Sequence, residues 1–229
     1  MLILYIGNKN YSSWSLRPWV LMHALDIPFE ERVEPFLPGS NWDAFRRFSP
    51  SGKVPALVTP LGTVWDSLAI VEFLAEQYKS VWPTDQAARM WARSATAEMH
   101  SGFFTLREVC SMSCGVRIRL HETTPALLKD LARVDELWCE GLEKFGGPFL
   151  AGDRFTAVDA FYAPVVFRVQ TYGLPLSECA LQYQRRMLAH PSMQQWYRDG
   201  LAETWRDVPH DVDCTRYGDV VEDFRADAQ

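Results

Sequence analysis

Three serines gather near the N-terminus of this 229-residue chain, in the stretch YSSWSLRPW at residues 11–19. Ser12, Ser13 and Ser15 follow a short apolar run and precede a segment whose apolar side chains recur at helical spacing. The first backbone N–H groups of a helix have no acceptor within it, so hydroxyls beside them create a site suited to an anion. A thiolate is one anion that such a site could stabilise.

This turn alone can supply the free energy needed to stabilise a bound thiolate. A free thiol has a pKa of about 8.5, and lowering it by about 2 units requires about 2.7 kcal/mol. One hydrogen bond to a charged group contributes roughly 1.5–3 kcal/mol, and a helix N-terminus adds about 0.3–2 kcal/mol. A serine hydroxyl would therefore act as a hydrogen-bond donor, and neither a metal nor a general base is required.

The first eighty residues alternate between strand and helix patterns. Strands are predicted at residues 2–6, 29–33, 56–59 and 63–65, and helices at 15–25, 42–48 and 67–77. This order predicts an α/β domain with a mixed sheet over residues 1–80.

Strand patterns almost vanish after a linker at residues 81–88. Helices are predicted at residues 87–112, 125–145, 157–169, 181–189 and 192–203, and an irregular tail follows from Pro209. Residues 89–229 are therefore expected to form an all-α C-terminal domain.

Two further motifs in the first domain could bind a peptide-like ligand. The segment GKVPAL, at residues 52–57, precedes a strand, and a cis Val54–Pro55 bond would turn the backbone of Val54 outward to pair with an extended peptide. The segment DSLAI begins a helix at Asp66, so Ser67 could bind a carboxylate while Asp66 binds an ammonium group.

These three motifs, in this order, resemble those of the glutathione transferase superfamily, and the resemblance covers nearly the whole chain. The pattern S-S-x-S-x-R at residues 12–17 is similar to the serine-type turn of zeta-like bacterial members. The resemblance implies a thioredoxin-like N-terminal domain and a helical C-terminal domain. The segment GDRFTAVD, where Asp159 can cap a helix together with Thr156, resembles a structural motif of the same family.

The resemblance also implies roles for individual residues toward glutathione, the expected co-substrate. Ser12 would donate to the thiolate, and Ser13 and Trp14 would line the same turn. Val54 would pair with the cysteinyl backbone, and Lys53 would meet the glycine carboxylate. In the same way, Asp66 and Ser67 would hold the γ-glutamyl end.

Alternatives remain for the thiol donor and for the reaction. Ser13, Tyr5 or Tyr11 could replace Ser12 as the donor. Trp14 stands where zeta-like members usually have cysteine, which weakens the case for maleylacetoacetate isomerase activity, and Asp66 is one methylene shorter than the usual Glu. Glutathione conjugation, glutathione-dependent isomerisation and a non-catalytic binding module all stay open, with conjugation preferred.

The second substrate would be a small electrophilic or acidic molecule held between the domains. Residues 100–120 and the tail are expected to line its site, with Arg107 and Arg117 available to an acidic group. A thiol–disulfide oxidoreductase is disfavoured because that activity needs a cysteine at the first helix, and the first cysteine is Cys110.

Composition limits the partners and the location of the chain. The net charge of −6 disfavours nucleic acid as a partner, and no apolar run approaches the length of a membrane span. Five cysteines without framework spacing fit a reducing compartment, so a cytoplasmic protein is expected. Cys110 and Cys114 are expected to be core residues, with no metal site, and the resemblance implies a homodimer.

Overall fold

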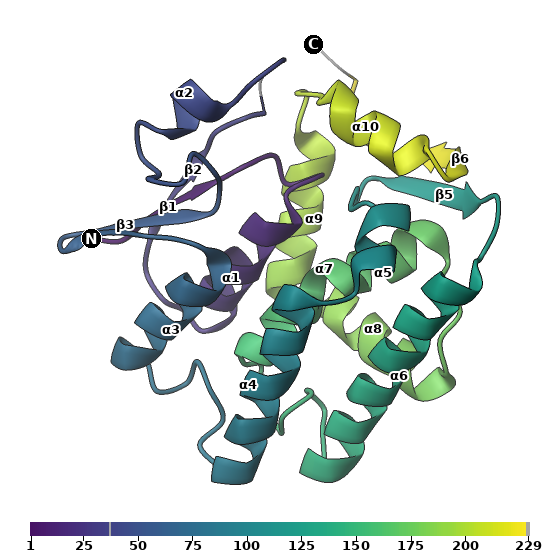
Figure 1. Cartoon of the computed structure of the whole chain (residues 1–229). Helices are drawn as coiled ribbons and strands as arrows, with labels where there is room; N and C mark the ends of the chain where they lie inside the picture. The colour runs from purple at the N-terminus through teal and green to yellow at the C-terminus, as the bar shows by residue number, and fades with distance from the viewer. Residues whose placement is uncertain (37, 228–229) are drawn as a thin grey trace.

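The computed structural model describes residues 1–36 and 38–227 (Figure 1). The N-terminal domain contains a mixed sheet with the strand order β2-β1-β3-β4. β1 (Ile3–Ile6) runs parallel to β2 (Glu30–Val33) and antiparallel to β3 (Ala56–Thr59), and β3 pairs antiparallel with β4 (Gly62–Val64). The predicted mixed sheet is confirmed.

Three helices complete the N-terminal domain: α1 (Ser13–Ala24), α2 (Trp42–Phe45) and α3 (Ser67–Gln77). α1 and α3 pack against each other and against the strands, and Figure 1 shows both below the sheet with α2 above it. Leu4 and Leu57 from the sheet are fully buried in the same core as Leu16 of α1. This packing fixes the N-terminal end of α1 at one edge of the domain.

The C-terminal domain is built from seven helices among the described residues. They are α4 (Gln86–Ser101), α5 (Phe104–Val109), α6 (Pro125–Phe145), α7 (Ala157–Tyr172), α8 (Glu178–Ala189), α9 (Pro191–Ala202) and α10 (Val208–Thr215). α7 is the central helix, since all its residues except Gln170 are buried, and it packs against α1, α4 and α8. The expected thioredoxin-like domain followed by a helical domain is therefore observed. None of the described helices has the length and apolarity needed to cross a membrane.

Two expectations for the C-terminal domain were wrong in detail. The helix expected over residues 87–112 is interrupted at Gly102, and Phe103 adopts the left-handed conformation with φ of 57° before α5 begins. The tail is ordered rather than irregular, because β6 (Gly218–Asp223) pairs antiparallel with β5 (Val116–Leu120). This ribbon joins segments about a hundred residues apart in the sequence, and short local patterns do not reveal such a pairing.

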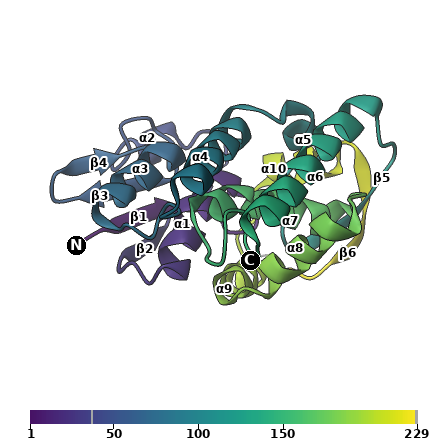
Figure 2. The same cartoon turned by 90° about the horizontal axis from the view of Figure 1, so that it is seen from below.

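The two domains meet along α1, as the view from below in Figure 2 shows. The ammonium group of Lys9 lies 2.9 Å from Glu31 and 2.7 Å from Asp199 of α9. The carboxylate of Glu203 accepts from the backbone N–H of Lys9 at 2.7 Å and of Asn10 at 3.2 Å. These contacts hold the turn before α1 against the C-terminal domain.

Candidate functional site

A cavity of about 500 Å³ lies where the first turn of α1 faces the C-terminal domain. Its N-terminal wall consists of Tyr11, Ser12, Ser13, Trp14, Phe36, Asn41, Phe45, Gly52, Lys53 and Val54. Its C-terminal wall consists of Ser111, Met112, Arg168 and His210. An adjoining cavity of about 370 Å³ shares Trp14, Lys53 and Val54 with the first and reaches Asp66. The structure thus brings Ser12, Ser13, Trp14, Lys53, Val54 and Asp66 to the two joined cavities. Ser67 lines neither cavity, nor do Arg107 and Arg117, which were expected at the second-substrate site.

The serine turn carries a short hydrogen-bond chain. Ser12 is buried, and its hydroxyl donates to Ser15 Oγ at 2.7 Å. Ser15 Oγ also accepts from the backbone N–H of Gly7 at 3.2 Å. Ser13 is half-buried, and no described residue hydrogen-bonds to its hydroxyl. A hydroxyl can rotate to a better acceptor, so both Ser12 and Ser13 can turn toward a ligand in the cavity.

The first turn of α1 also presents backbone donors. Within residues 1–36 and 38–227, no acceptor lies within hydrogen-bond reach of the backbone N–H groups of Trp14 and Ser15. Unpaired N–H groups in the first turn are the source of the partial positive charge at a helix N-terminus. The cavity therefore has the electrostatic character that suits an anion.

The two tyrosines that competed with Ser12 are committed to other contacts. Tyr11 lines the cavity, but its hydroxyl donates to Asp211 at 3.1 Å and accepts from Arg225 at 3.0 Å. Burial and the Asp211 carboxylate raise the pKa of Tyr11 well above its ordinary value. Tyr5 lies outside the cavity, stacked on Phe48 with 4.1 Å between ring centroids. Neither phenol is placed to donate freely to a ligand at the serine turn.

The loop before β3 presents an open length of backbone. The Val54–Pro55 bond is cis, as expected from the sequence. Among the described residues, neither the N–H nor the C=O of Val54 has a hydrogen-bond partner, so an extended peptide can pair with both. Lys53 is exposed beside them. Gly52 has a φ of +63°, a conformation that L side chains rarely adopt, and this turn directs Lys53 and Val54 into the cavity.

The start of α3 forms the far end of the adjoining cavity. Asp66 Oδ1 accepts from the backbone N–H of Leu68 at 2.9 Å, and its Oδ2 lies 3.5 Å from His100 Nε2. Burial lowers the pKa of His100, although Asp66 acts in the opposite direction. Ser67 is fully buried, and its hydroxyl has no partner among the described residues.

A buried arginine behind Trp14 was given no role from the sequence. The guanidinium of Arg17 lies 4.1 Å from the centroid of the Trp14 ring, and its Nε and Nη1 lack hydrogen-bond partners among the described residues. Burial, with help from Arg107 and Arg168, lowers the pKa of Arg17 well below its ordinary value. Three arginines, Arg17, Arg107 and Arg168, therefore lie close enough on this side of the site to influence one another, although the whole chain is acidic.

The C-terminal wall contains residues that sequence reasoning missed. His210 of α10 stacks between Tyr11 and Phe36, at centroid distances of 5.2 Å and 4.9 Å, and its Nδ1 lies 2.6 Å from Asp207. Arg168 of α7 lines the same cavity. No local signal marks either residue, since one lies in a segment that looked irregular and the other within an apolar core helix.

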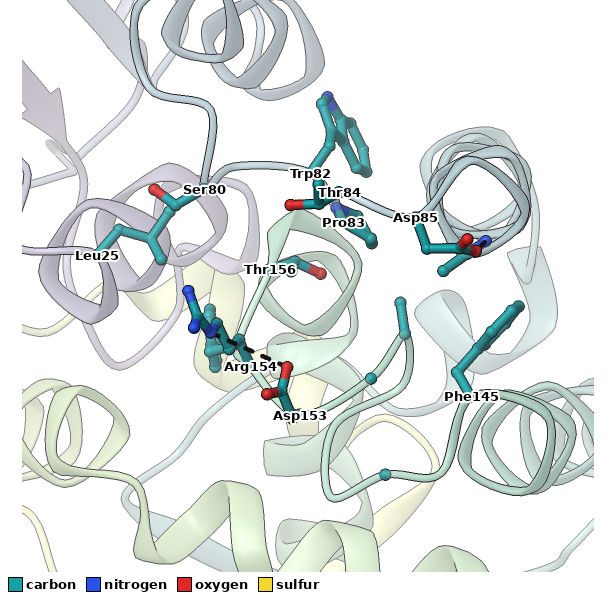
Figure 3. A pocket seen from close by; sticks show the side chains of 15 residues that line it. Leu25, Ser80, Trp82, Pro83, Thr84, Asp85, Phe145, Asp153, Arg154 and Thr156 are labelled. Carbon is teal, nitrogen blue, oxygen red and sulfur yellow. Dashed lines mark hydrogen bonds and ion pairs between the residues drawn. The ribbon is translucent and has the colours of Figure 1, made fainter.

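A different cavity, of about 550 Å³, lies between the linker and the loop before α7 (Figure 3). Its polar groups take part in hydrogen bonds at the starts of the neighbouring helices. Asp85 caps α4 by accepting from the N–H of Ala88 at 2.8 Å, and the N–H of Thr156 donates to Asp159 at 3.0 Å. None of the predicted site residues lines this cavity, so we assign the functional site to the cavity beside α1.

Comparison with known proteins places this arrangement in a family. The sequence model of the glutathione S-transferase N-terminal domain matches residues 11–77, and that of the C-terminal domain matches residues 119–199. Glutathione S-transferase GstB of Escherichia coli is 24% identical over 216 residues, which cover 86% of this chain and 92% of that protein. A probable maleylacetoacetate isomerase of Caenorhabditis elegans is 23% identical over 184 residues, which cover 76% of this chain and 82% of that protein.

A solved structure gives the same answer for the fold. The crystal structure of a glutathione transferase homologue from Burkholderia, with bound glutathione, matches with a TM-score of 0.63 at 24% identity and covers 87% of this chain and 97% of that one. Both domains therefore match in kind and in order, and the chain belongs to the glutathione S-transferase family.

Proposed function

We propose that this chain is a glutathione transferase, which binds glutathione in the two joined cavities and directs its thiolate at a small electrophile. The serine turn carries the proposal. The buried hydroxyl of Ser12 and the unpaired backbone N–H of Trp14 belong to residues that line the same cavity as Val54, with whose open backbone a peptide could pair. A cytoplasmic location belongs to the same proposal.

Each part of glutathione has a complementary group along the N-terminal wall and the adjoining cavity. The open N–H and C=O of Val54 suit the backbone of the cysteinyl residue. Lys53 suits the glycine carboxylate. Asp66, at the far end of the adjoining cavity, suits the γ-glutamyl ammonium group. Ser67, proposed for the carboxylate beside it, lines neither cavity, so its buried hydroxyl would have to become accessible when glutathione binds.

Thiolate formation would require Ser12 to exchange its present partner. Turning from Ser15 toward a sulfur anion gives up a neutral hydrogen bond of about 0.5–1.5 kcal/mol for a charged one of roughly 1.5–3 kcal/mol. The N-terminal end of α1, with its unpaired N–H groups, adds about 0.3–2 kcal/mol. Together these contributions approach the roughly 2.7 kcal/mol that corresponds to a shift of 2 units in the thiol pKa.

The pH dependence of the bound thiol tests this role. In Ser12→Ala, glutathione should still bind, but ultraviolet difference spectra should show the thiol pKa raised by about 1–2 units, because one charged hydrogen bond is lost. At pH 7, kcat/KM should then fall by roughly threefold to twenty-five-fold, the factor by which the thiolate fraction falls when a pKa near 6.5 rises by about 1–2 units.

Ser13→Ala is the matched control, because Ser13 lies in the same turn and loses the same oxygen. Its bound thiol should keep the wild-type pKa. Loss of the thiolate in Ser13→Ala alone would transfer the donor role to Ser13. A wild-type protein that binds glutathione without a lowered thiol pKa would contradict the proposed mechanism and favour a non-catalytic binding module.

Glutathione-dependent isomerisation is the second candidate function. The similarity to a probable maleylacetoacetate isomerase supports it. Turnover of maleylacetone without net consumption of glutathione would favour isomerisation, whereas stoichiometric loss of the thiol with a chloronitrobenzene would favour conjugation.

A homodimer is part of both proposals, and sedimentation equilibrium of the purified chain tests it.

A further inference from the structure

Arg168 combines burial with access to the cavity beside α1. It lies in α7, is 6% exposed, and lines the cavity together with Ser12, Ser13 and Val54. Its Nε donates to the backbone carbonyl of Cys110 at 2.7 Å, which fixes the plane of the guanidinium. The neutral carbonyl satisfies one donor and leaves the positive charge without a counter-ion.

No described residue supplies that counter-ion. Within residues 1–36 and 38–227, no carboxylate oxygen lies within 4.0 Å of the Arg168 guanidinium. The groups that influence its charge are Arg107, a second cation, and the side chains of Cys110, Tyr172 and Cys214. Burial raises the pKa of Cys110 to about 12 and that of Cys214 to about 11, so these thiols are neutral at physiological pH.

Arg168 itself remains charged. Burial and the neighbouring Arg107 lower its pKa to about 10, which still leaves it protonated at neutral pH. A buried cation without a partner is costly, and an anionic ligand that reaches it removes part of that cost. A planar guanidinium is also well suited to a carboxylate, which it can bind through two parallel hydrogen bonds.

The remaining lining residues indicate which chemical groups the ligand carries besides its carboxylate. Phe36, Phe45 and Met112 supply apolar surface, and His210, whose ring is stacked between Tyr11 and Phe36, also lines the cavity. A small molecule with an apolar or aromatic body and one carboxylate fits this combination. Glutathione, if it lies along Lys53, Val54 and Asp66, leaves this part of the cavity to the second substrate.

We propose that Arg168 is the specificity-determining residue of the second-substrate site and that it selects electrophiles that carry a carboxylate. This proposal rests on the proposed binding of glutathione beside it.

Binding of two matched glutathione conjugates tests the proposal without any need for turnover. S-benzylglutathione and S-(4-carboxybenzyl)glutathione differ only in the carboxylate on the ring. Isothermal titration calorimetry should give about tenfold tighter binding of the carboxybenzyl conjugate to the wild-type chain, which corresponds to about 1.4 kcal/mol. Arg168→Met should lose this preference while it still binds S-benzylglutathione, and Arg168→Lys should retain part of it.

Arg89→Met is the matched control. Among the described residues, Arg89 also donates only to backbone carbonyls, those of Pro83 at 3.0 Å and Thr84 at 2.7 Å, and it lies outside the site. This variant should keep the wild-type preference. Thermal unfolding of each variant checks that the fold is retained.

The outcomes separate the two proposals. Equal wild-type affinity for the two conjugates would overturn the role of Arg168, whether or not its variants fold. A preference that survives in Arg168→Met would overturn it as well, and equal weakening of both conjugates would show that Arg168 serves glutathione or the fold. Failure of the wild-type chain to bind either conjugate would instead refute the proposed glutathione site.

Discussion

The two walls of the cavity are built in different ways. The N-terminal wall combines main-chain features, the first turn of α1 and the open backbone of Val54, with side chains from the same short stretches of sequence, such as Ser12 and Lys53. The C-terminal wall relies on side chains, including Arg168 and His210, which come from separate segments of the chain. Main-chain geometry suits a constant ligand, whereas side chains can change without disturbing the fold. This division matches the proposed binding of glutathione by one wall and of a variable electrophile by the other.

Two aspartates that cap helices, one in each domain, differ in how far their side chains are exposed. Asp159 at the start of α7 is fully buried, whereas the side chain of Asp66 at the start of α3 is 55% exposed. The buried aspartate is part of the scaffold of the C-terminal domain. The exposed aspartate is available to a ligand. Four predictions test how far this difference between the domains extends.

The largest effect is expected for Asp159→Ala. Its carboxylate accepts from the N–H groups of Leu150 and Thr156, both at 3.0 Å, and from the Tyr183 hydroxyl at 2.9 Å. Removal leaves three buried donors unpaired and should lower the free energy of unfolding by about 4 kcal/mol. Urea unfolding provides the measurement. A loss below about 1 kcal/mol would show that this cap is no more important than an exposed one.

Arg225→Met should produce the next largest effect, by loosening the tail that carries His210. Arg225 is held by Asp211 at 2.6 Å, by Asp223 at 2.7 Å and by the Tyr11 hydroxyl at 3.0 Å. We expect a loss of about 2 kcal/mol in unfolding free energy, since these are charged hydrogen bonds in a half-buried setting.

The two-wall comparison makes a sharper prediction for the kinetics of the same variant. KM for the electrophile should rise several-fold, while the affinity for glutathione should remain within about twofold of the wild-type value. If the affinity for glutathione changed more than KM for the electrophile, the tail would support the glutathione site of the N-terminal wall and not the electrophile site.

Gly52→Ala should disturb the N-terminal wall selectively. A Cβ at this position would lie 2.5 Å from the Trp42 ring, and the φ of +63° would be strained. The backbone cost should be about 1–2 kcal/mol, and glutathione should bind more weakly because Lys53 and Val54 move.

Gly173→Ala offers a matched control for this substitution. Gly173 has a φ of +58°, but a Cβ there would meet nothing within 4 Å. It should share the backbone cost without weakening the binding of glutathione. Similar glutathione affinity in the two variants would mean that the loop at Gly52 does not position the ligand.

The smallest loss of stability is expected for Asp66→Ala, at about 1 kcal/mol, because it removes one exposed helix cap. Asp85→Ala at the start of α4 removes a similar cap and should cost a similar amount. Only Asp66→Ala should weaken glutathione binding, as measured by calorimetry. Equal glutathione affinity in the two variants would remove Asp66 from the proposed site.

Local sequence patterns predict the parts of the fold that depend on residues close together in the chain. The mixed sheet, α3 and α6, and the cap at Thr156 follow from local patterns, and each is present in the structure. The cis Val54–Pro55 bond, which the sequence left as an option, is present as well. The residues proposed for glutathione fall in three short stretches for the same reason, since turns and helix starts present main-chain groups that nearby side chains specify.

The C-terminal wall of the cavity, by contrast, depends on contacts between distant parts of the chain. Pairing of β5 with β6 folds the tail back, α10 then brings His210 onto Tyr11, and α7 carries Arg168 into the cavity. These contacts join residues separated by long stretches of chain, and their stability comes from burial and charge rather than from local propensity. The missing counter-ion of Arg168 is likewise a property of its whole surroundings, so no local pattern could reveal it.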